Sequence, residues 1–472
     1  YSDGRNITLE SAFEYRTPSE LQIEGEGIIY DSEVDPSNNY LFLAAGPKGV
    51  LVQDLSLAER GENALVARYA LPSNYFALGI NGFFERNNDR LFVTAALLDK
   101  DGAPIKDSAR VFVFAVNSFD ISQAQLVKSL ALGANFAKGI RAENNQVYVA
   151  AGDSGLQILD SHLHTKLYSA ASYQTKFDAL DVAELELQQG KFFAVASGKY
   201  NFASQTLDTS SVKSGQLDII QHNAELGLKH VASIDLPGSH LAVNGTRVYM
   251  AMGALGAAII DIENPYQPKL IARLVNYGPV HDVAIQGNIL HLATGESGVV
   301  SLNVADAKNI KPTAGKLAIK YPVYVLTTSN YALYTAGSKS LKSESSYMIG
   351  RYIDSELRVI RVQPLPHYVN EKLDNVVVSF NKAIDLYDKN NDFVFARNIN
   401  GEVIPSDIEI TNNDISISPN LSQLSVNETF DIVVKSGLAS VKPLPNNNYL
   451  KIASLENDVV TRFKYINEED IN

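Results

Sequence analysis

The 472-residue chain contains no cysteine, no tryptophan and only three methionines. The absence of cysteine excludes disulfide bonds, thiol catalysis and cysteine-ligated zinc. The absence of tryptophan leaves 23 tyrosines and 19 phenylalanines to supply all the aromatic packing. The chain also lacks any run of about 18 apolar residues, so it predicts no membrane-spanning helix.

Positive charge is scarce as well. Lysine and arginine number 40 against 53 aspartates and glutamates, which gives a net charge of −13. This balance opposes binding to nucleic-acid phosphates and to anionic membranes. The apolar fraction of 45% is that of a globular protein, and the length predicts at least two hydrophobic cores. The sequence opens on Tyr1-Ser2-Asp3-Gly4 without a signal peptide, which predicts a processed chain or a segment of a longer one with further domains as partners.

An internal repeat is the main feature that the chain does have. Each clear copy reads as an apolar strand, a Gly-x-x-Gly turn and a second apolar strand. The four clear copies are YLFLAAGPKGVLVQDLS (Tyr40–Ser56), QVYVAAGDSGLQILDSH (Gln146–His162), RVYMAMGALGAAIIDIE (Arg247–Glu263) and ILHLATGESGVVSLNVA (Ile289–Ala305). Three diluted copies begin at Arg90, Lys191 and Tyr331. In these copies the turn is replaced by the segments Asp99–Asp107, Lys199–Ser214 and Lys339–Ser345.

The seven copies are spaced by 42 to 56 residues, near the period of a four-stranded propeller blade. Each has a further strand before it and another after it, except that the last copy lacks the outer strand. Ile7–Arg16 (ITLESAFEYR) has the pattern of that missing strand, and its pairing would remove two open sheet edges. The prediction is an all-β chain whose residues 1–355 form a seven-bladed β-propeller closed by an N-terminal strand.

Part of the repeat resembles the LVIVD-repeat family. The resemblance lies in Asp282-Val283-Ala284, in Gly287-Asn288, in Ile259–Ile262 and in the prolines of Asn264–Pro268. It implies a bacterial or archaeal propeller, usually in exported or cell-surface proteins. No single activity accompanies the family, so the resemblance implies fold and location only.

Residues 356–466 break the period and predict a separate β-sandwich of short alternating strands. The stretches Val376–Leu386, Ile415–Leu438 and Thr461–Tyr465 resemble bacterial Ig-like domains of the surface-layer type. In that family such domains are spacers or stalks of surface proteins. Residues 467–472 are predicted to be a polar tail.

The three insertions are predicted to lie on one face of the propeller, around the mouth of the axial channel, because all of them replace the same turn. Aromatic and imidazole side chains at the starts of the innermost strands are expected at the same mouth. They can stack on a sugar or grip a peptide, or can simply pack between blades. These candidate ligand-binding residues are Phe76, Phe136, Phe177, His240 and His281, with Tyr200 and Phe202 from an insertion.

Other motifs favour structural explanations. The Gly-x-x-Gly turns link two strands, so a tight hairpin explains them better than a phosphate clamp. Asp385, Asp388, Asn390 and Asp392 alternate as calcium ligands do, and Asp99 with Asp101 form a second acidic loop, but neither has the EF-hand glutamate. Turn formation is the alternative in both places.

Catalytic motifs are lacking, since neither HExxH nor GxSxG occurs. His281-Asp282 is the best catalytic pair, but Asp181 fills the same repeat position as Asp282, which favours a structural role. No catalytic residue is therefore predicted.

The resulting hypothesis is a non-catalytic recognition or scaffold segment of an exported bacterial surface protein or large exoprotein. It would bind a protein or glycan through the insertion-bearing face, with no nucleic acid, no membrane insertion and no cofactor other than calcium. The expected location is extracellular or at the cell surface, the periplasm being less favoured. The alternatives are a propeller hydrolase or lyase with its site in the channel, and a purely structural shell segment of a toxin or adhesin.

Overall fold

The protein is described by a computed structural model that covers residues 21–464 with gaps, the longest of which are 313–320, 364–374 and 385–392. Contacts between residues divide the chain into two compact units. The first comprises Tyr1–Ile285 with Ile289–Tyr352, and the second comprises Ile353–Asn472 with Gln286–Asn288.

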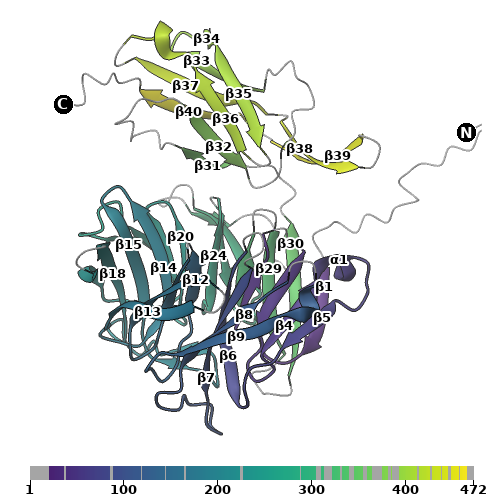
Figure 1. Ribbon diagram of the computed structural model, residues 1–472. Coiled ribbons are helices and arrows are strands. Elements are labelled where there is room, and N and C mark those ends of the chain that lie inside the picture. The colour runs from purple at the N-terminus through teal and green to yellow at the C-terminus, as the bar shows by residue number, and fades with distance from the viewer. Residues whose placement is uncertain are drawn as a thin grey trace, which may run out of the picture. The chain divides into compact units, whose positions relative to one another are not determined.

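The described part of the first unit is a β-propeller built from seven four-stranded sheets (Figure 1). In each sheet, strands that follow one another in the chain pair side by side, apart from the N-terminal strand of the last sheet and from a separate two-stranded hairpin that lies in the chain between the second and third strands of the fourth. The sheets are β2–β5 (Asp31–Val34, Tyr40–Ala44, Val50–Asp54, Leu65–Tyr69), β6–β9 (Tyr75–Phe83, Arg90–Leu97, Arg110–Ala115, Gln125–Ala131), β10–β13 (Ile140–Glu143, Gln146–Ala150, Leu156–Leu163, Lys166–Tyr173), β14, β15, β18 and β19 (Ala179–Leu187, Gly190–Ser197, Gln216–Asn223, Gly227–Ile234), β20–β23 (His240–Asn244, Arg247–Ala251, Ala257–Asp261, Lys269–Leu274), β24–β27 (Asp282–Gln286, Ile289–Ala293, Val299–Asn303, Lys311–Pro312), and β28–β30 with β1 (Val323–Thr328, Ala332–Ser338, Ser346–Ile353, Leu21–Glu26).

An N-terminal strand closes the last sheet, as the sequence predicts. The strand in this position is β1, which pairs antiparallel with β30 from Leu21 opposite Arg351 to Glu26 opposite Ser346. Its alternating pattern buries Leu21 and Ile23 and exposes the residues between and beside them, as an outer strand requires. The segment predicted for this role, Ile7–Arg16, lies outside the described residues.

The Gly-x-x-Gly turns join each blade to the next one. Gly46 donates its backbone N–H to Ala77 O (3.1 Å) and accepts the N–H of Ala77 (2.9 Å), with φ at 55°. A Cβ on Gly49 would lie 2.3 Å from the carbonyl oxygen of Tyr69, the last residue of the outer strand. The same reciprocal pair of bonds joins Gly152 to Ala179, Gly253 to Val280 and Gly295 to Val323. The turn therefore serves as a joint between blades, and the hairpin interpretation of the sequence agrees with its backbone angles.

The hydrophobic cores lie between neighbouring sheets rather than within single ones. One cluster combines Phe42 and Val52 of the first sheet with Ile80 and Val93 of the second. Another joins Phe192 and Ile219 to Val248 and Ile260 across the fourth and fifth sheets. Each blade thus depends on its neighbours to bury its faces.

The second unit is a β-sandwich of two four-stranded sheets with one shared core. The sheets are β31 (Val359–Gln363), β32 (Val376–Phe380), β36 (Asp414–Pro419) and β35 (Ser406–Thr411), against β34 (Val403–Ile404), β33 (Val394–Asn398), β37 (Thr429–Val434) and β40 (Val459–Lys464). Phe380, Ile417, Phe430 and Phe463 are among the residues that fill the space between the sheets. A further hairpin, β38 (Ala439–Leu444) with β39 (Asn448–Ser454), was not predicted from the sequence.

Candidate functional site: the axial channel and the insertion-bearing face

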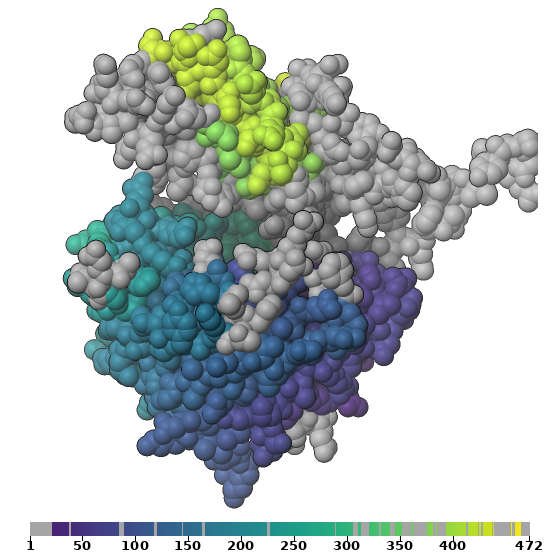
Figure 2. Space-filling view, in the orientation of Figure 1, coloured from purple at the N-terminus to yellow at the C-terminus, as the bar shows by residue number. Residues whose placement is uncertain are grey.

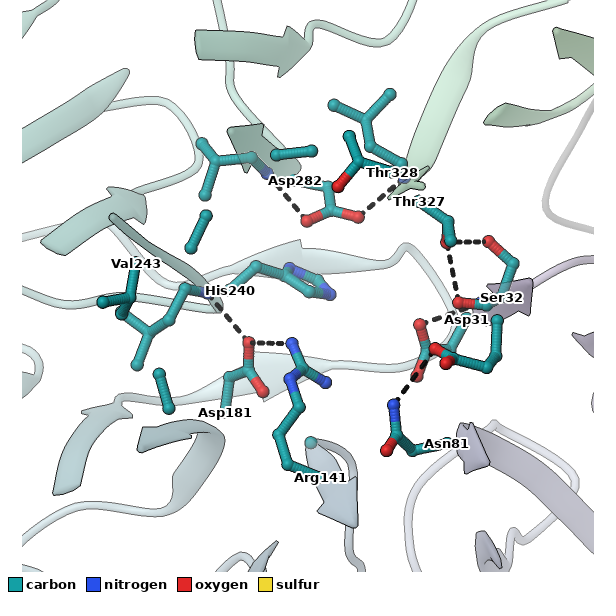
Figure 3. Close-up of a pocket in the computed structure, with 18 of the residues that line it drawn as sticks. Asp31, Ser32, Asn81, Arg141, Asp181, His240, Val243, Asp282, Thr327 and Thr328 are labelled. Atoms are coloured by element: carbon teal, nitrogen blue, oxygen red, sulfur yellow. Dashed lines mark hydrogen bonds and ion pairs between the residues drawn. The ribbon is translucent and has the colours of Figure 1, made fainter. Parts of the chain in front are cut away.

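Three aspartates hold the innermost strands of the propeller together. Asp31, Asp181 and Asp282 stand at or near the starts of β2, β14 and β24. One oxygen of each accepts the N–H of the following residue, at 2.8, 2.9 and 2.7 Å. The other oxygen accepts a backbone N–H from the neighbouring inner strand, namely that of Ile80 (2.9 Å), Leu241 (2.8 Å) or Leu326 (2.8 Å). One oxygen of each carboxylate therefore binds its own strand, and the other joins that strand to the next blade (Figure 3).

Other groups make three further joints between inner strands. Asn81 Oδ1 accepts the N–H of Ala142 (2.8 Å), and Gly139 donates its N–H to Leu180 O (2.9 Å). Thr327 Oγ1 donates to Ser32 O (2.7 Å), which connects the last sheet to the first. The inner strands are thus joined around the axis by buried hydrogen bonds, a place where a lost partner is costly.

The pair His281-Asp282 does not form a catalytic arrangement. The carboxylate of Asp282 is engaged with Val283 and Leu326, whereas the His281 ring packs edge-on against Tyr324 at 4.8 Å between centroids. Among the described residues, no hydrogen bond joins the two side chains. The structural role inferred for Asp282 from its repeat position agrees with these contacts.

The inner strands surround a cavity of about 420 Å³ in the axial channel (Figure 3). One side of its lining is polar and includes Asp31, Glu33, Asn81 and Arg141. Sheets four to six line the other side with the apolar side chains of Ala183, Ala242, Val243, Ala284 and Ile285, which stand among Asp181, Glu184, His240 and Asp282 on the same strands. The Arg141 side chain still exposes 39% of its surface, so the cavity is open to water although protein surrounds it.

Burial dominates the electrostatics of this cavity. It raises the pKa of Asp31 to about 6, of Asp282 to about 7 and of Glu33 to about 8, although Arg141 or Lys138 lies close enough to oppose each shift. Burial likewise lowers the pKa of Lys138 and holds the pKa of His240 well below its usual value. Arg141 pairs with Asp181 at 3.7 Å, and Lys138 Nζ contacts the His240 ring. The cavity therefore holds carboxyl groups that ionise only reluctantly.

These shifted pKa values predict how replacing Glu33 changes stability with pH. The unfolded chain releases the Glu33 proton near pH 4.5, whereas the folded chain keeps it up to about pH 8. Because the folded state binds more protons in this window, Glu33 lowers the stability progressively as the pH rises through it. Calorimetry should show that the unfolding temperature of Glu33→Gln minus that of the natural protein increases by roughly 2–4 °C from pH 5 to pH 8. A difference that does not change with pH would contradict the shift.

Four of the predicted channel-mouth residues meet in one cluster. Phe76, Phe136, Tyr200 and Phe202 pack together with Leu78 and Leu180, among others. The Phe136 and Phe202 rings lie 4.8 Å apart, edge to face, with only 5% and 3% of each residue exposed. Phe136 lies just before its inner strand, β10, which begins at Ile140. Gly139, between them, makes the backbone hydrogen bond to Leu180 of the next blade.

The insertion Lys199–Ser214 folds inward rather than standing away from the propeller. Its hairpin, β16 (Tyr200–Asn201) with β17 (Thr206–Leu207), places Phe202 and Leu207 in the cluster formed by the starts of the inner strands. The Lys138 ammonium lies 5.4 Å from the centre of the Tyr200 ring. The hairpin therefore covers the end of the channel at the insertion-bearing face. Replacing it with a short turn would uncover Phe136 and Leu180 and is therefore expected to destabilise the propeller.

The other predicted residues lie elsewhere. His240 lines the axial cavity beside Lys138. The backbone of Gln205 in the hairpin hydrogen-bonds to His281, and Phe177 lies 5.1 Å from the Lys176 ammonium. Sequence reasoning missed Asp31, Glu33, Lys138 and Arg141. The signal for Asp31 and Glu33 was a pair of acids at alternate positions on an inner strand, whereas Lys138 and Arg141 do not share this spacing.

A groove of about 390 Å³ lies on the insertion-bearing face. Its lining combines Tyr30, Phe76 and Phe202 with Lys48 of a Gly-x-x-Gly turn and the loop Asp99–Gly102. The segment after β7 that contains this loop projects from the lower end of the propeller in Figures 1 and 2. The Asp99 carboxylate accepts the N–H groups of Asp101 and Ala103, both at 2.9 Å, and so shapes its own loop.

The predicted calcium ligands Asp385, Asp388, Asn390 and Asp392 lie outside the described residues. In the part of the chain that the structure covers, no group of three or more His, Asp or Glu side chains is placed to hold a metal ion. No described helix is long and apolar enough to cross a membrane.

Comparison with protein families identifies both parts of the chain. The LVIVD-repeat model matches residues 238–275, the range that contains β20–β23. The bacterial Ig-like domain model matches residues 354–456. The chain carries an LVIVD repeat and a bacterial Ig-like domain. Both family resemblances are thereby confirmed. Ig-like domains of this kind occur in bacterial surface proteins.

Comparison with solved structures confirms the propeller fold. A chain of the mitotic checkpoint complex and the structure of U3-55K each align with a TM-score of 0.52, and the RRP9 WD40 repeats align with 0.51. Each alignment is 10% identical and covers 71% of this chain. It covers 95% of the checkpoint-complex chain, 99% of U3-55K and 98% of the RRP9 repeats. At this identity the similarity concerns the fold alone. No curated protein matches the sequence.

Proposed function

We propose that this chain is a non-catalytic recognition segment of an exported bacterial surface protein or large exoprotein. Its propeller binds a protein or glycan through the insertion-bearing face, outside the cell or at its surface. The observation that carries the proposal is the groove in which two insertions meet, because the Asp99–Gly102 loop and Phe202 line it together with Tyr30 and Phe76.

The chemistry of the groove suits a sugar or a peptide side chain. Aromatic rings offer stacking surface, and Lys48, Lys100 and Asp101 supply charged hydrogen-bonding groups around it. The rival hydrolase or lyase hypothesis needs free acids in the channel, whereas three of the acids there, Asp31, Asp181 and Asp282, are engaged with backbone N–H groups. A purely structural shell segment would need no such groove.

Point substitutions in the groove test this proposal. A glycan array and a pull-down with the full chain should first identify a ligand. Phe76→Ala and Lys100→Ala should then weaken its binding by tenfold or more, because each removes a group that lines the groove. Lys128→Ala, an exposed residue on the outer strand β9, is the matched control and should bind as the natural protein does. Equal binding by all three variants would place the ligand elsewhere and overturn the proposal.

A further inference from the structure

We propose that the axial cavity is a second binding site, separate from the groove, for an organic cation. The ligand class is an aliphatic chain that ends in a primary ammonium or a guanidinium. Such a group occurs in small free amines and at the ends of lysine and arginine side chains. The inference rests on the charge balance of the cavity, on its apolar wall and on its size.

The cavity contains more carboxyl groups than the cations of the protein neutralise. Six carboxyl groups line it among the described residues, those of Asp31, Glu33, Glu143, Asp181, Glu184 and Asp282, against two cations, Lys138 and Arg141. Glu184 pairs with Lys191 outside the cavity lining, at 2.7 Å. Arg141 pairs with Asp181, and its guanidinium also donates to its own neighbour, Ile140 O (2.7 Å). Among the described residues, no lysine or arginine lies within ion-pair distance of Asp31 or Glu33.

Glu33 is the carboxyl group with most capacity for a ligand. It lies two residues after Asp31 on β2, so the two side chains project from the same face of the strand. Both oxygens of Asp31 accept backbone N–H groups, whereas Glu33 receives its hydrogen bond from Asn81 Nδ2 (3.0 Å) through one oxygen. A buried carboxylate without a countercharge is costly, and a bound ammonium would supply one.

The apolar wall gives the aliphatic part of the ligand its place. Ala183, Ala242, Val243, Ala284 and Ile285 line the cavity beside the polar groups of the same sheets, and methylene groups packed against them would lose contact with water. The volume of about 420 Å³ is within the range of small-molecule sites. Because the β16–β17 hairpin covers one end of the channel, entry is from the other end, where the inner strand β10 finishes at the exposed Glu143.

Alternative ligands fit these observations less well. A metal ion needs several His, Asp or Glu ligands together, and none are so placed among the described residues. An anion would meet a cavity whose carboxyl groups outnumber its cations, with Arg141 already paired to Asp181. An organic cation with an apolar chain matches both sides of the lining.

Cation binding should displace the proton of Glu33. The charged and titratable groups around Glu33 are Asp31 on its own strand and Arg141 on β10, and Asn81 of β6 bonds to it. A bound ammonium favours the ionised carboxylate, so protons are released and affinity rises between pH 6 and pH 8. The aliphatic amine itself stays protonated in this range.

Isothermal titration calorimetry of the full chain tests the site with n-pentylamine, n-pentylguanidine and the uncharged 1-pentanol. We expect both cations to bind at millimolar concentration or below, and 1-pentanol to bind at least tenfold more weakly. Glu33→Gln should weaken pentylamine binding by tenfold or more. Glu186→Gln, an exposed residue of the same charge on β14, should leave it unchanged.

Two further arms complete the test. Ala242→Leu reduces the cavity from its apolar wall and should also weaken pentylamine binding, which keeps the test open if Glu33→Gln fails to fold. A blocked glycyl-lysyl-glycine peptide that binds more tightly than pentylamine would assign the site to a lysine side chain, and the reverse order would assign it to a free amine. Equal binding of pentylamine and 1-pentanol, or unchanged pentylamine binding in folded Glu33→Gln, would overturn the proposal.

Discussion

Removing residues 1–26 should destabilise the propeller by about 3–6 kcal/mol, because it removes β1 from the last sheet. Leu21 and Ile23 are each only 8% exposed, and burying such a side chain contributes roughly 1.5–3 kcal/mol. The deletion would also uncover the pairing edge of β30 beside the buried Tyr347 and Met348, and an open edge strand promotes association between chains.

A shorter deletion is the matched control. Removing residues 1–19 leaves β1 intact, so the unfolding temperature measured by calorimetry should not change. The longer deletion should lower that temperature and increase aggregation measured by light scattering. If the shorter deletion already had the full effect, closure would depend on a segment such as Ile7–Arg16 rather than on β1.

The choice between these two strands shows what the sequence could and could not predict. Period and alternation predicted that a strand near the N-terminus completes the last sheet. Both Ile7–Arg16 and Leu21–Glu26 carry a pattern suited to an outer strand, so local propensity could not decide between them. The choice depends on the pairing register with β30, which is more than 300 residues away in the sequence.

The candidate site was predicted only in part for a similar reason. Sequence reasoning placed Phe76, Phe136, Tyr200 and Phe202 near one end of the channel, and the structure brings these four together. It did not predict that the insertion folds inward, because that depends on apolar partners such as Leu180 from distant blades. The charged cavity was missed because Asp31 and Glu33 lie on β2 and Arg141 on β10, and only the closed ring gathers them.

Replacing Asp181 with alanine should destabilise the propeller by about 2–6 kcal/mol. The substitution leaves the N–H groups of Val182 and Leu241 without their acceptor, and each unsatisfied buried group costs roughly 1–3 kcal/mol. Asp181→Asn should lower the stability less than Asp181→Ala, because its side-chain oxygen can still accept one of the two backbone N–H groups. Its amide NH₂ group would face the other N–H, which is also a donor. Arg141 would also lose the carboxylate with which it pairs.

Urea unfolding followed by circular dichroism can measure this loss, since the chain has no tryptophan to report by fluorescence. Asp101→Ala is the control, because that aspartate is exposed in the loop after β7, and the change should stay within about 0.5 kcal/mol. An equally small effect of Asp181→Ala would mean that the inner strands are held by blade packing alone. A large effect confined to Asp181 would establish that a charged residue inside the channel holds two blades together, and that an acid which recurs at this position of the repeat has a structural role.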